Sequence, residues 1–290
     1  MGSRHVGHAA CRAFLGTCTV TKMACFPDQP PLSDHPLIKA FKQGVAKTVP
    51  SGGKVKPTTY FSLHRLFVHI ASMSDNDDTC SIAVLRDKLI LLLLIDGMAR
   101  ASDIETITRE GIVFRDQMVH FRYYWTKETK TPQEVPMSIN DYPSQRSICT
   151  VTVMRKYLAR TASAQFPVAT RSQWVEGKLL PRTPLLIQDH KKKGDTFFPV
   201  LGRERIAKIA VIALKAIGAE GYTAHNVRGA SASKCRNLGS PFDTICARAR
   251  WANEQTFLVS YYRRCTYVGP PFGDRQLEWL VRYAAQRVGG

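Results

Sequence analysis

The sequence lacks several features that define common classes of protein. Its longest unbroken apolar run, residues 89–95, is far too short to cross a bilayer. The eight cysteines include no C-x-x-C pair and no partnered histidine cluster, which argues against a zinc site and favours free thiols. A glycine-rich P-loop motif and a secretory leader are also missing. These absences predict an intracellular protein in a reducing compartment that needs no metal or cofactor.

Negative charge is scarce as well. The 290 residues carry 41 Lys and Arg against 23 Asp and Glu, which gives a net charge of +18 and a pI near 9.8. Such an excess favours a polyanionic partner, with nucleic acid as the first candidate and a membrane surface as the second. The one run of like charge is Lys191, Lys192 and Lys193. A run of this kind is either a solvated loop or a contact to DNA phosphates.

The length favours two domains, and the polar run at residues 74–78 marks a boundary. We expect a small helical domain over residues 1–78 and a larger catalytic domain over residues 79–290. Apolar residues at helical spacing predict a long helix from Ser81 to Ile95 with Gly97 as its C-cap. Ser102 and Asp103 can cap the short helix that follows, which is expected to end near Thr108.

Alternating β-branched and aromatic residues predict a small antiparallel sheet after this short helix. Its strands are expected at residues 112–114, 118–125 and 134–137, with turns at 116–117 and 126–131. Helical patterns follow at residues 148–162, 204–217, 225–237, 241–249, 253–262 and 275–288. The fold class predicted is therefore α+β, mainly helical, with one small three-stranded antiparallel sheet.

The strongest local motif is a helix start that carries His225 and Arg228, three residues apart and so on one face. Taken singly, each candidate has an ordinary explanation as a helix-end cation, a turn lysine or a core aromatic residue. Their joint order along the chain carries the signal. That order is Arg100 followed by Asp103, then Lys127 on a hairpin, His225, Arg228, Trp251 and Tyr261.

This order resembles the tyrosine recombinase and integrase family over about residues 80–265, with Trp251 at the position where the family has His or Trp. The lead-in at residues 35–45 and the ending at residues 251–262 look most like recombinases of DIRS-like eukaryotic retroelements, with Crypton-type elements close behind. The resemblance implies a DNA strand-exchange enzyme, in the nucleus if the host is eukaryotic. It also implies a helical core-binding domain that closes on duplex DNA together with the catalytic domain.

The residue types suit the transfer of a phosphodiester. A pentavalent phosphate gathers negative charge on its oxygens, and the guanidinium forks of Arg100 and Arg228 can donate paired hydrogen bonds to them. The resemblance makes Tyr261 the nucleophile of a covalent 3′-phosphotyrosine, which conserves the bond energy and needs no ATP or metal. Lys127 would protonate the leaving 5′ oxygen, His225 and Trp251 would donate to the scissile phosphate or shape its pocket, and Asp103 would orient Arg100 or His225.

Two assignments have a close neighbour as alternative. Lys130 shares the turn of Lys127, and Lys127 is preferred because the family places this lysine several residues before a Val-Pro step, here residues 135–136. Tyr262 adjoins Tyr261, but successive helical residues point about 100° apart, so only one can face the phosphate. Tyr261 is preferred because related endings put the nucleophile four residues after the Phe of Thr-Phe.

The end of the sequence carries an apolar stripe at helical spacing. In the family, such a helix docks on a neighbouring subunit and gives a tetramer on two double-stranded DNA sites; the alternative is packing onto its own domain. Two other functions compete with recombination: relaxation by a type IB topoisomerase, and DNA binding by a catalytically silent domesticated protein. The stripe consists of Leu277, Leu280, Val281, Ala284, Ala285 and Val288.

Overall fold

The computed structural model describes residues 61–75, 80–124, 134–162, 167–175, 178–191 and 194–262. All of these lie in the second of two compact units, Thr58–Gly290. Most of the helical domain predicted over residues 1–78, and the stripe at residues 277–288, therefore lie outside the described residues. The described part of the first predicted domain includes α3 (Leu63–Ser72), which packs against η3 (Arg146–Ile148) and α7 (Arg203–Ala216). The boundary at residue 78 stays a prediction.

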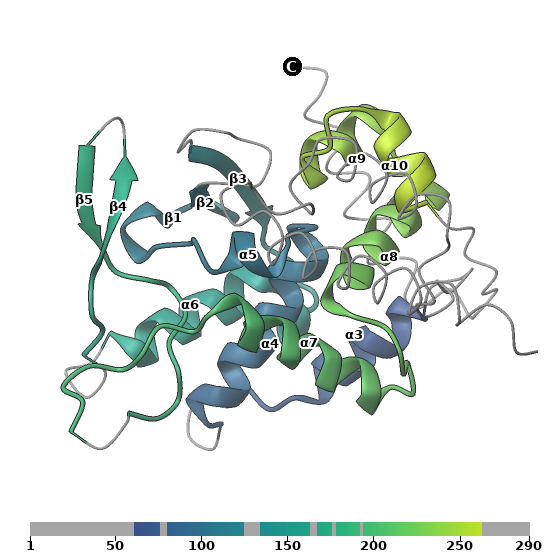
Figure 1. Ribbon diagram of the computed structural model, residues 1–290. Helices are drawn as coiled ribbons and strands as arrows, with labels where there is room; N and C mark the ends of the chain where they lie inside the picture. The colour runs from purple at the N-terminus through teal and green to yellow at the C-terminus, as the bar shows by residue number, and fades with distance from the viewer. Residues whose placement is uncertain are drawn as a thin grey trace, which may run out of the picture. The chain divides into compact units, whose positions relative to one another are not determined.

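Helix α4 (Ile82–Asp96) is the centre of the fold. It contacts α5 (Ala101–Ile104), α6 (Thr150–Thr161), α7 and α8 (Ala224–Asn237), which surround it (Figure 1). Its residues 89–95 are at most 1% exposed, so the apolar run of the sequence is buried on every side rather than on one face. The helix begins where the sequence predicts, and Ser81 is its N-cap, because the Ser81 hydroxyl accepts the amide of Val84 at 3.3 Å. No helix in the described ranges is both long enough and apolar enough to span a membrane.

The predicted three-stranded sheet is confirmed. Strands β1 (Val113–Arg115), β2 (Met118–Tyr124) and β3 (Glu134–Asn140) pair in that order, all antiparallel. In the middle of β2, burial alternates with period two: Val119, Phe121 and Tyr123 are buried, whereas His120 and Arg122 between them are more exposed. The third strand runs three residues past its expected end at residue 137, since Ser138, Ile139 and Asn140 still pair with β2.

A second sheet was not predicted. Strands β4 (Arg171–Val175) and β5 (Lys178–Arg182) form a two-stranded hairpin that lies to one side of the helices (Figure 1). Its base is tied to the segment after α5: Arg171 donates to the Glu105 carbonyl, and Gln173 Nε2 donates to the Thr106 carbonyl at 3.4 Å. The sequence of this hairpin, with charged and proline residues among few β-branched ones, gives little strand signal.

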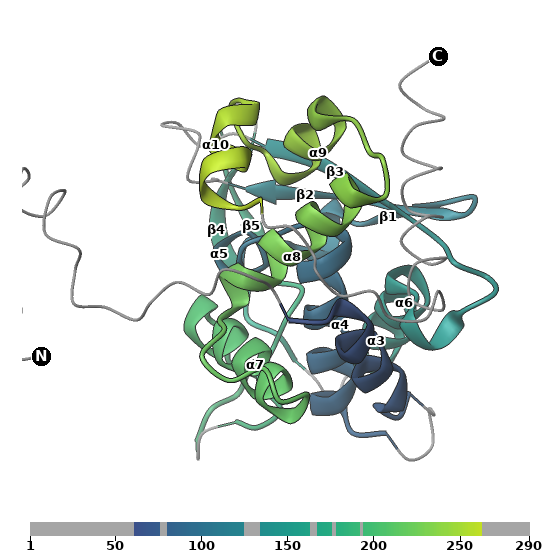
Figure 2. The ribbon, with the colours of Figure 1, turned by 90° about the vertical axis from the view of Figure 1, so that its right-hand side faces the viewer.

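The last described helices follow the predictions closely. Helices α7 and α8 each begin one residue earlier than expected, and α9 (Phe242–Ala249) and α10 (Glu254–Ser260) succeed them (Figure 2). One side chain fixes α9 to the rest of the fold. Arg248 donates through Nε to the Asp96 carbonyl at 2.8 Å and through Nη1 to the Ser138 carbonyl at 2.7 Å. This single guanidinium therefore joins α9 to the end of α4 and to β3.

The turn after α4 depends on a glycine for space rather than for an unusual φ. Gly97 is the predicted C-cap, but its φ is −80°, and the left-handed residue is Met98 with a φ of 43°. A Cβ atom at Gly97 would lie 2.8 Å from both the Leu93 carbonyl and the Tyr123 hydroxyl. Close packing of the helix end on β2 thus requires glycine here. The turn leads directly into Arg100.

Asp96, the last residue of α4, is a buried carboxylic acid. It is 4% exposed and its Oδ2 accepts the hydroxyl of Thr150. Burial raises the pKa of Asp96 to about 6, against the smaller opposing effects of the Thr150 hydrogen bond and the positive charge of Arg248. Because the unfolded chain releases this proton near the ordinary aspartate pKa of 3.8, stability falls as the pH rises from 3.8 through about 6.

We predict that Asp96→Asn removes this loss. A pKa that is two units higher in the folded state corresponds to about 3 kcal/mol at neutral pH, and the amide avoids it because it does not ionise. Urea unfolding at pH 4.5, 6 and 7.5 measures the effect, with the exposed Asp195→Asn as control. The stability of Asp96→Asn relative to wild type should increase with pH. A difference that stays constant over this range would contradict a raised pKa.

Candidate active site

The first predicted site residue, Arg100, begins α5. Arg100 itself is the N-cap, and Asp103 stands at the third helical position, so the prediction that Ser102 and Asp103 cap this helix was wrong in detail. The carboxylate has a reciprocal capping role instead. Its Oδ2 accepts the backbone amide of Arg100 at 2.8 Å, and Asp103 is 2% exposed. Asp103 therefore orients the backbone from which the Arg100 side chain extends.

His225 and Arg228 come from the first turns of α8. A capping box starts this helix, in which the Thr223 amide donates to the Asn226 side chain at 2.8 Å. The imidazole of His225 is exposed, whereas Arg228 is 0% exposed, although both lie on one face as predicted. The middle of the helix consists of the small buried residues 229–233, which allow it to pack closely in the core.

Arg228 is a buried cation with little internal compensation. One nitrogen, Nη2, donates to the carbonyl of Ala249, but Nε and Nη1 have no hydrogen-bond partner among the described residues. Burial lowers the pKa of Arg228 to about 10, and the positive charges of Arg100 and Arg250 add to the effect. The guanidinium is still protonated at neutral pH. Buried polar groups normally find a partner, so two unpaired donors on one cation indicate a place for an anion.

Two aromatic side chains cover this cation. The Arg228 guanidinium carbon lies 4.9 Å from the ring centre of Trp251 and 5.8 Å from that of Tyr261. The two rings are 4.4 Å apart, and the His225 ring is 5.0 Å from that of Tyr261. The main chain at Tyr261 is held by Ser233, whose hydroxyl donates to its carbonyl at 3.2 Å.

Tyr262 has different surroundings. Its hydroxyl donates to the Asn237 side chain at 3.2 Å, and its ring meets Phe257 edge-on at 5.6 Å. These contacts turn the Tyr262 ring towards α8 and α10, whereas the Tyr261 ring lies against Trp251 and His225. Of the two tyrosines, Tyr261 is thus the one whose ring lies with the other candidate residues.

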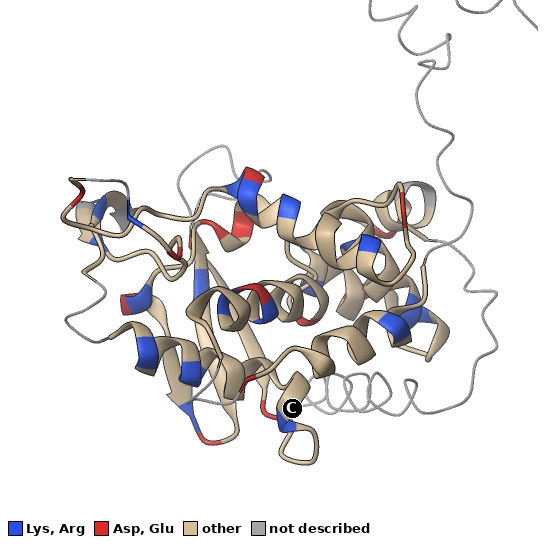
Figure 3. Cartoon of the chain, turned by 90° about the horizontal axis from the view of Figure 1, so that it is seen from below, with Lys and Arg blue, Asp and Glu red and all other residues tan. Residues whose placement is uncertain are grey.

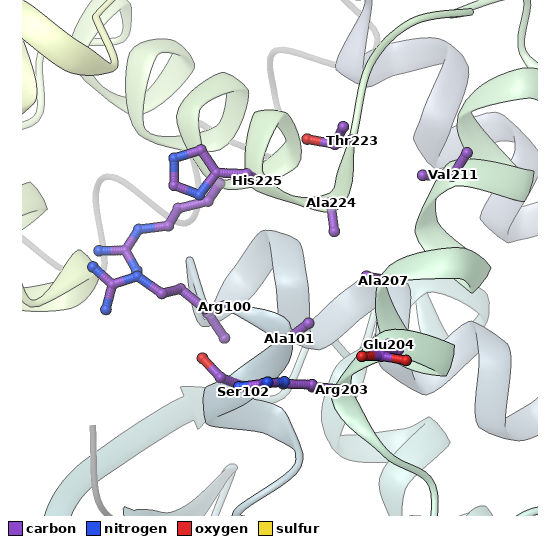
Figure 4. A pocket seen from close by; sticks show the side chains of 12 residues that line it. Arg100, Ala101, Ser102, Arg203, Glu204, Ala207, Val211, Thr223, Ala224 and His225 are labelled. Atoms are coloured by element: carbon purple, nitrogen blue, oxygen red, sulfur yellow. The ribbon is translucent and has the colours of Figure 1, made fainter. Parts of the chain in front are cut away.

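A cavity of about 500 Å³ opens at the arginines. Figure 4 shows Arg100 and His225 extending to the same side of it, whereas Glu204 and Val211 of α7 lie across from them. Apolar and small side chains form most of the remaining wall. The cavity therefore has a basic end where Arg100, His225 and Arg228 meet, and its other end is bounded by a helix.

Of the lysines predicted for the site, the structure describes only Lys191. Lys127, its alternative Lys130, and Lys192 and Lys193 lie outside the described residues. Lys191 is described, and its Nζ donates to the Thr196 carbonyl at 3.1 Å and lies 5.0 Å from the ring centre of Phe198. These contacts keep Lys191 within its own loop, although its side chain is still exposed.

One residue at this site was not predicted. Arg250 precedes Trp251, and its Nη2 forms an ion pair with the Asp103 carboxylate. The expectation that Asp103 orients Arg100 is consistent with the hydrogen bond from the Arg100 amide to the Asp103 carboxylate. The sequence does show an arginine next to the predicted Trp251. Its partner Asp103 lies 147 residues away, so no local pattern predicts the ion pair.

Comparisons with known proteins agree with this architecture. The sequence matches no protein-family model and no curated protein. Among solved structures, the XerH site-specific recombinase bound to difH in a pre-cleavage complex has a TM-score of 0.50 at 12% identity, covering 77% of this chain and 53% of the other. The chain thus spans about half the length of that recombinase.

Two more solved structures have slightly lower scores. The XerA recombinase has a TM-score of 0.49 at 14% identity, covering 86% of this chain and 73% of the other. The Tn1549 transposon integrase with circular intermediate DNA has a TM-score of 0.47 at 9% identity, covering 80% and 72%. With its central helix, its three-stranded antiparallel sheet and its likeness to XerH, the described chain has the fold of a tyrosine recombinase catalytic domain.

Proposed function

We propose that this protein is a tyrosine recombinase that cleaves and rejoins DNA through a covalent 3′-phosphotyrosine at Tyr261. The observation that carries the proposal is the buried guanidinium of Arg228, with two unpaired donors and the ring of Tyr261 beside it. A scissile phosphate at the basic end of the cavity would accept those donors together with the fork of Arg100. The Tyr261 ring lies 5.8 Å from the Arg228 guanidinium of the same chain, which favours cleavage in cis.

The proposed reaction is a reversible transesterification. The Tyr261 oxygen attacks phosphorus, the 5′ oxygen of the broken strand leaves, and the negative charge that builds on the non-bridging oxygens is stabilised by Arg100 and Arg228. His225, exposed at the mouth of the site, can donate to the same phosphate. Lys127 is proposed as the acid for the leaving oxygen, because its ammonium group can donate the proton that the departing 5′ oxygen takes up.

The partner proposed is double-stranded DNA. Lys and Arg lie on many elements of the described chain (Figure 3), and the whole sequence carries a net charge of +18. The XerH and Tn1549 structures are complexes of those proteins with DNA. We further propose a role in a DIRS-like or Crypton-type mobile element, a nuclear location in a eukaryotic host and assembly as a tetramer on two DNA sites. These proposals come from the sequence motifs.

The nucleophile is tested by removing one hydroxyl. Tyr261→Phe should abolish covalent attachment to a nicked suicide substrate and leave DNA affinity nearly unchanged, because only the attacking oxygen is lost. Tyr262→Phe is the matched control, since its hydroxyl binds Asn237, and it should retain attachment. Denaturing gels of labelled DNA measure both variants. Attachment that survives in Tyr261→Phe and disappears in Tyr262→Phe would move the nucleophile by one residue. A wild-type protein that binds DNA without attachment would be a silent DNA-binding protein instead.

The two arginines are tested by conservative substitution. Arg100→Lys and Arg228→Lys keep the charge but lose the planar fork, and each should slow cleavage by about 10²-fold or more. Arg236→Lys is the control from the same helix as Arg228, because Arg236 contacts Phe242 and Ser240 instead of the cavity. Single-turnover cleavage rates at saturating DNA provide the comparison. If either test variant cleaves within about threefold of wild type, that arginine does not act on the phosphate.

The proposed assembly is tested by truncation. Deleting residues 274–290 should leave a protein that binds DNA but does not form a synaptic tetramer, because the apolar stripe that would join subunits is gone. Light scattering on site DNA, with recombination and supercoil relaxation measured in parallel, gives the answer. Normal tetramers from the truncated protein would show that this segment packs on its own subunit. Relaxation by a monomer would favour the topoisomerase alternative.

A further inference from the structure

Arg250 takes no part in the reaction proposed above, yet it is buried within the site. Its side chain is 9% exposed and pairs with Asp103, whose side chain is 1% exposed. The guanidinium carbon also lies 4.3 Å from the ring centre of Tyr123 on β2. The carboxylate and the aromatic face restrain the Arg250 side chain, whereas its Nε and Nη1 have no hydrogen-bond partner among the described residues. It does not line the cavity that Arg100 and Arg228 share.

The backbone at Arg250 is unusual for a residue with a Cβ atom. Its φ is 55°, in the left-handed region that glycine adopts most readily. The position terminates α9, and its amide donates to the Cys246 and Ala247 carbonyls. A left-handed helix end of this kind is commonly glycine, so the local backbone gives no reason for an arginine. The reason must lie in the contacts of the side chain.

Those contacts connect the start of α5, which carries Arg100, with the turn after α9. Asp103 Oδ2 accepts the Arg250 side chain and also the backbone amide of Arg100 at 2.8 Å. On either side of Arg250 in the sequence, the Ala249 carbonyl accepts Arg228, and the Trp251 ring lies over the same arginine. Three consecutive residues of one turn thus contact the site: Ala249 binds Arg228, Arg250 is linked to Arg100 through Asp103, and Trp251 lies beside Tyr261.

We infer that Arg250 is a positioning residue whose ion pair with Asp103 fixes Arg100 relative to Arg228, Trp251 and Tyr261. The effect on cleavage rests on the proposed function, whereas the effect on the Arg100 backbone does not. Without the ion pair, the start of α5 and the turn after α9 lose their direct polar link. Arg100 then samples positions in which its fork no longer meets the phosphate, and small displacements of this kind are costly for rate.

The test variant is Arg250→Gly, because glycine accepts the left-handed backbone and the fold is retained. Arg250→Lys keeps a cation that can still reach Asp103. Asp116→Gly is the matched control, since it also removes a charged side chain from a positive φ, 48°, but in the turn between β1 and β2. Two quantities are measured: the rate of covalent attachment at saturating DNA, and hydrogen exchange at the Arg100 amide in the free protein.

Arg250→Gly should slow attachment by roughly 10-fold to 100-fold with DNA affinity within about threefold of wild type. Exchange at the Arg100 amide should become about tenfold faster, because its acceptor is no longer held. Arg250→Lys should recover part of both effects, and Asp116→Gly should show neither. In the background of Asp103→Asn, Arg250→Gly should slow attachment little further, since the two residues act through one link.

Two results would overturn the inference: unchanged exchange at the Arg100 amide in Arg250→Gly, or losses that multiply in the double variant. Multiplying losses would mean that Arg250 acts on the phosphate directly. If wild-type protein forms no covalent complex, the proposed function fails. The exchange measurement still decides whether Arg250 fixes Arg100.

Discussion

Burial of the Arg228 guanidinium is the constraint around which the site is organised. A cation removed from water needs compensation, and the described residues offer one carbonyl and two aromatic faces but no carboxylate in direct contact. Its neighbours Arg100 and Arg250 make the local potential still more positive, as the lowered pKa of Arg228 indicates. Such a cluster is stabilised when an anion completes it. The position of this one side chain therefore favours the binding of an anion, such as the phosphate proposed above.

The elements that surround Arg228 are fixed by contacts between residues far apart in the sequence. Arg248 joins α9 to the end of α4 and to β3, and Arg250, two residues further along the chain, joins the following turn to α5. Because the carbonyls and the carboxylate that these two arginines bind are themselves part of packed elements, α9 has little freedom to move. The rings of Trp251 and Tyr261, which follow α9 in the sequence, are therefore also restricted in their motion.

Sequence patterns predicted the parts of this structure that depend on local chemistry. The start of α4 near Ser81, the alternation in the middle of β2 and the common face of His225 and Arg228 all follow from periodicity and short-range hydrogen bonds. The β4–β5 hairpin was missed because its residues have little strand propensity and its anchors at Glu105 and Thr106 are distant. The glycine at residue 97 was placed at the helix end, but its cause is contact with Tyr123 on another element, which no local pattern encodes.

In the candidate site, too, some features could be predicted from the sequence and others depend on tertiary contacts. The order of Arg100, His225, Arg228, Trp251 and Tyr261 could be predicted from a resemblance, and the structure brings their side chains together. The role of Arg250 could not be predicted, because it depends on a partner brought near only by the tertiary fold. The choice of Tyr261 over Tyr262 gains a physical basis from the contact between Tyr262 and Asn237.

The span of these contacts has a consequence for how the protein forms. Arg250 and Asp103 are 147 residues apart, and Arg248 and Asp96 are 152 apart. Closing such long loops costs chain entropy before the contacts repay it, so local helices and the β1–β3 sheet should form first and the arginine cluster late. During synthesis, a chain that has emerged only as far as α8 carries Arg100, His225 and Arg228 but neither the turn that orients them nor the tyrosine. The DNA cleavage proposed for this protein would then arise only in a chain that is almost completely folded.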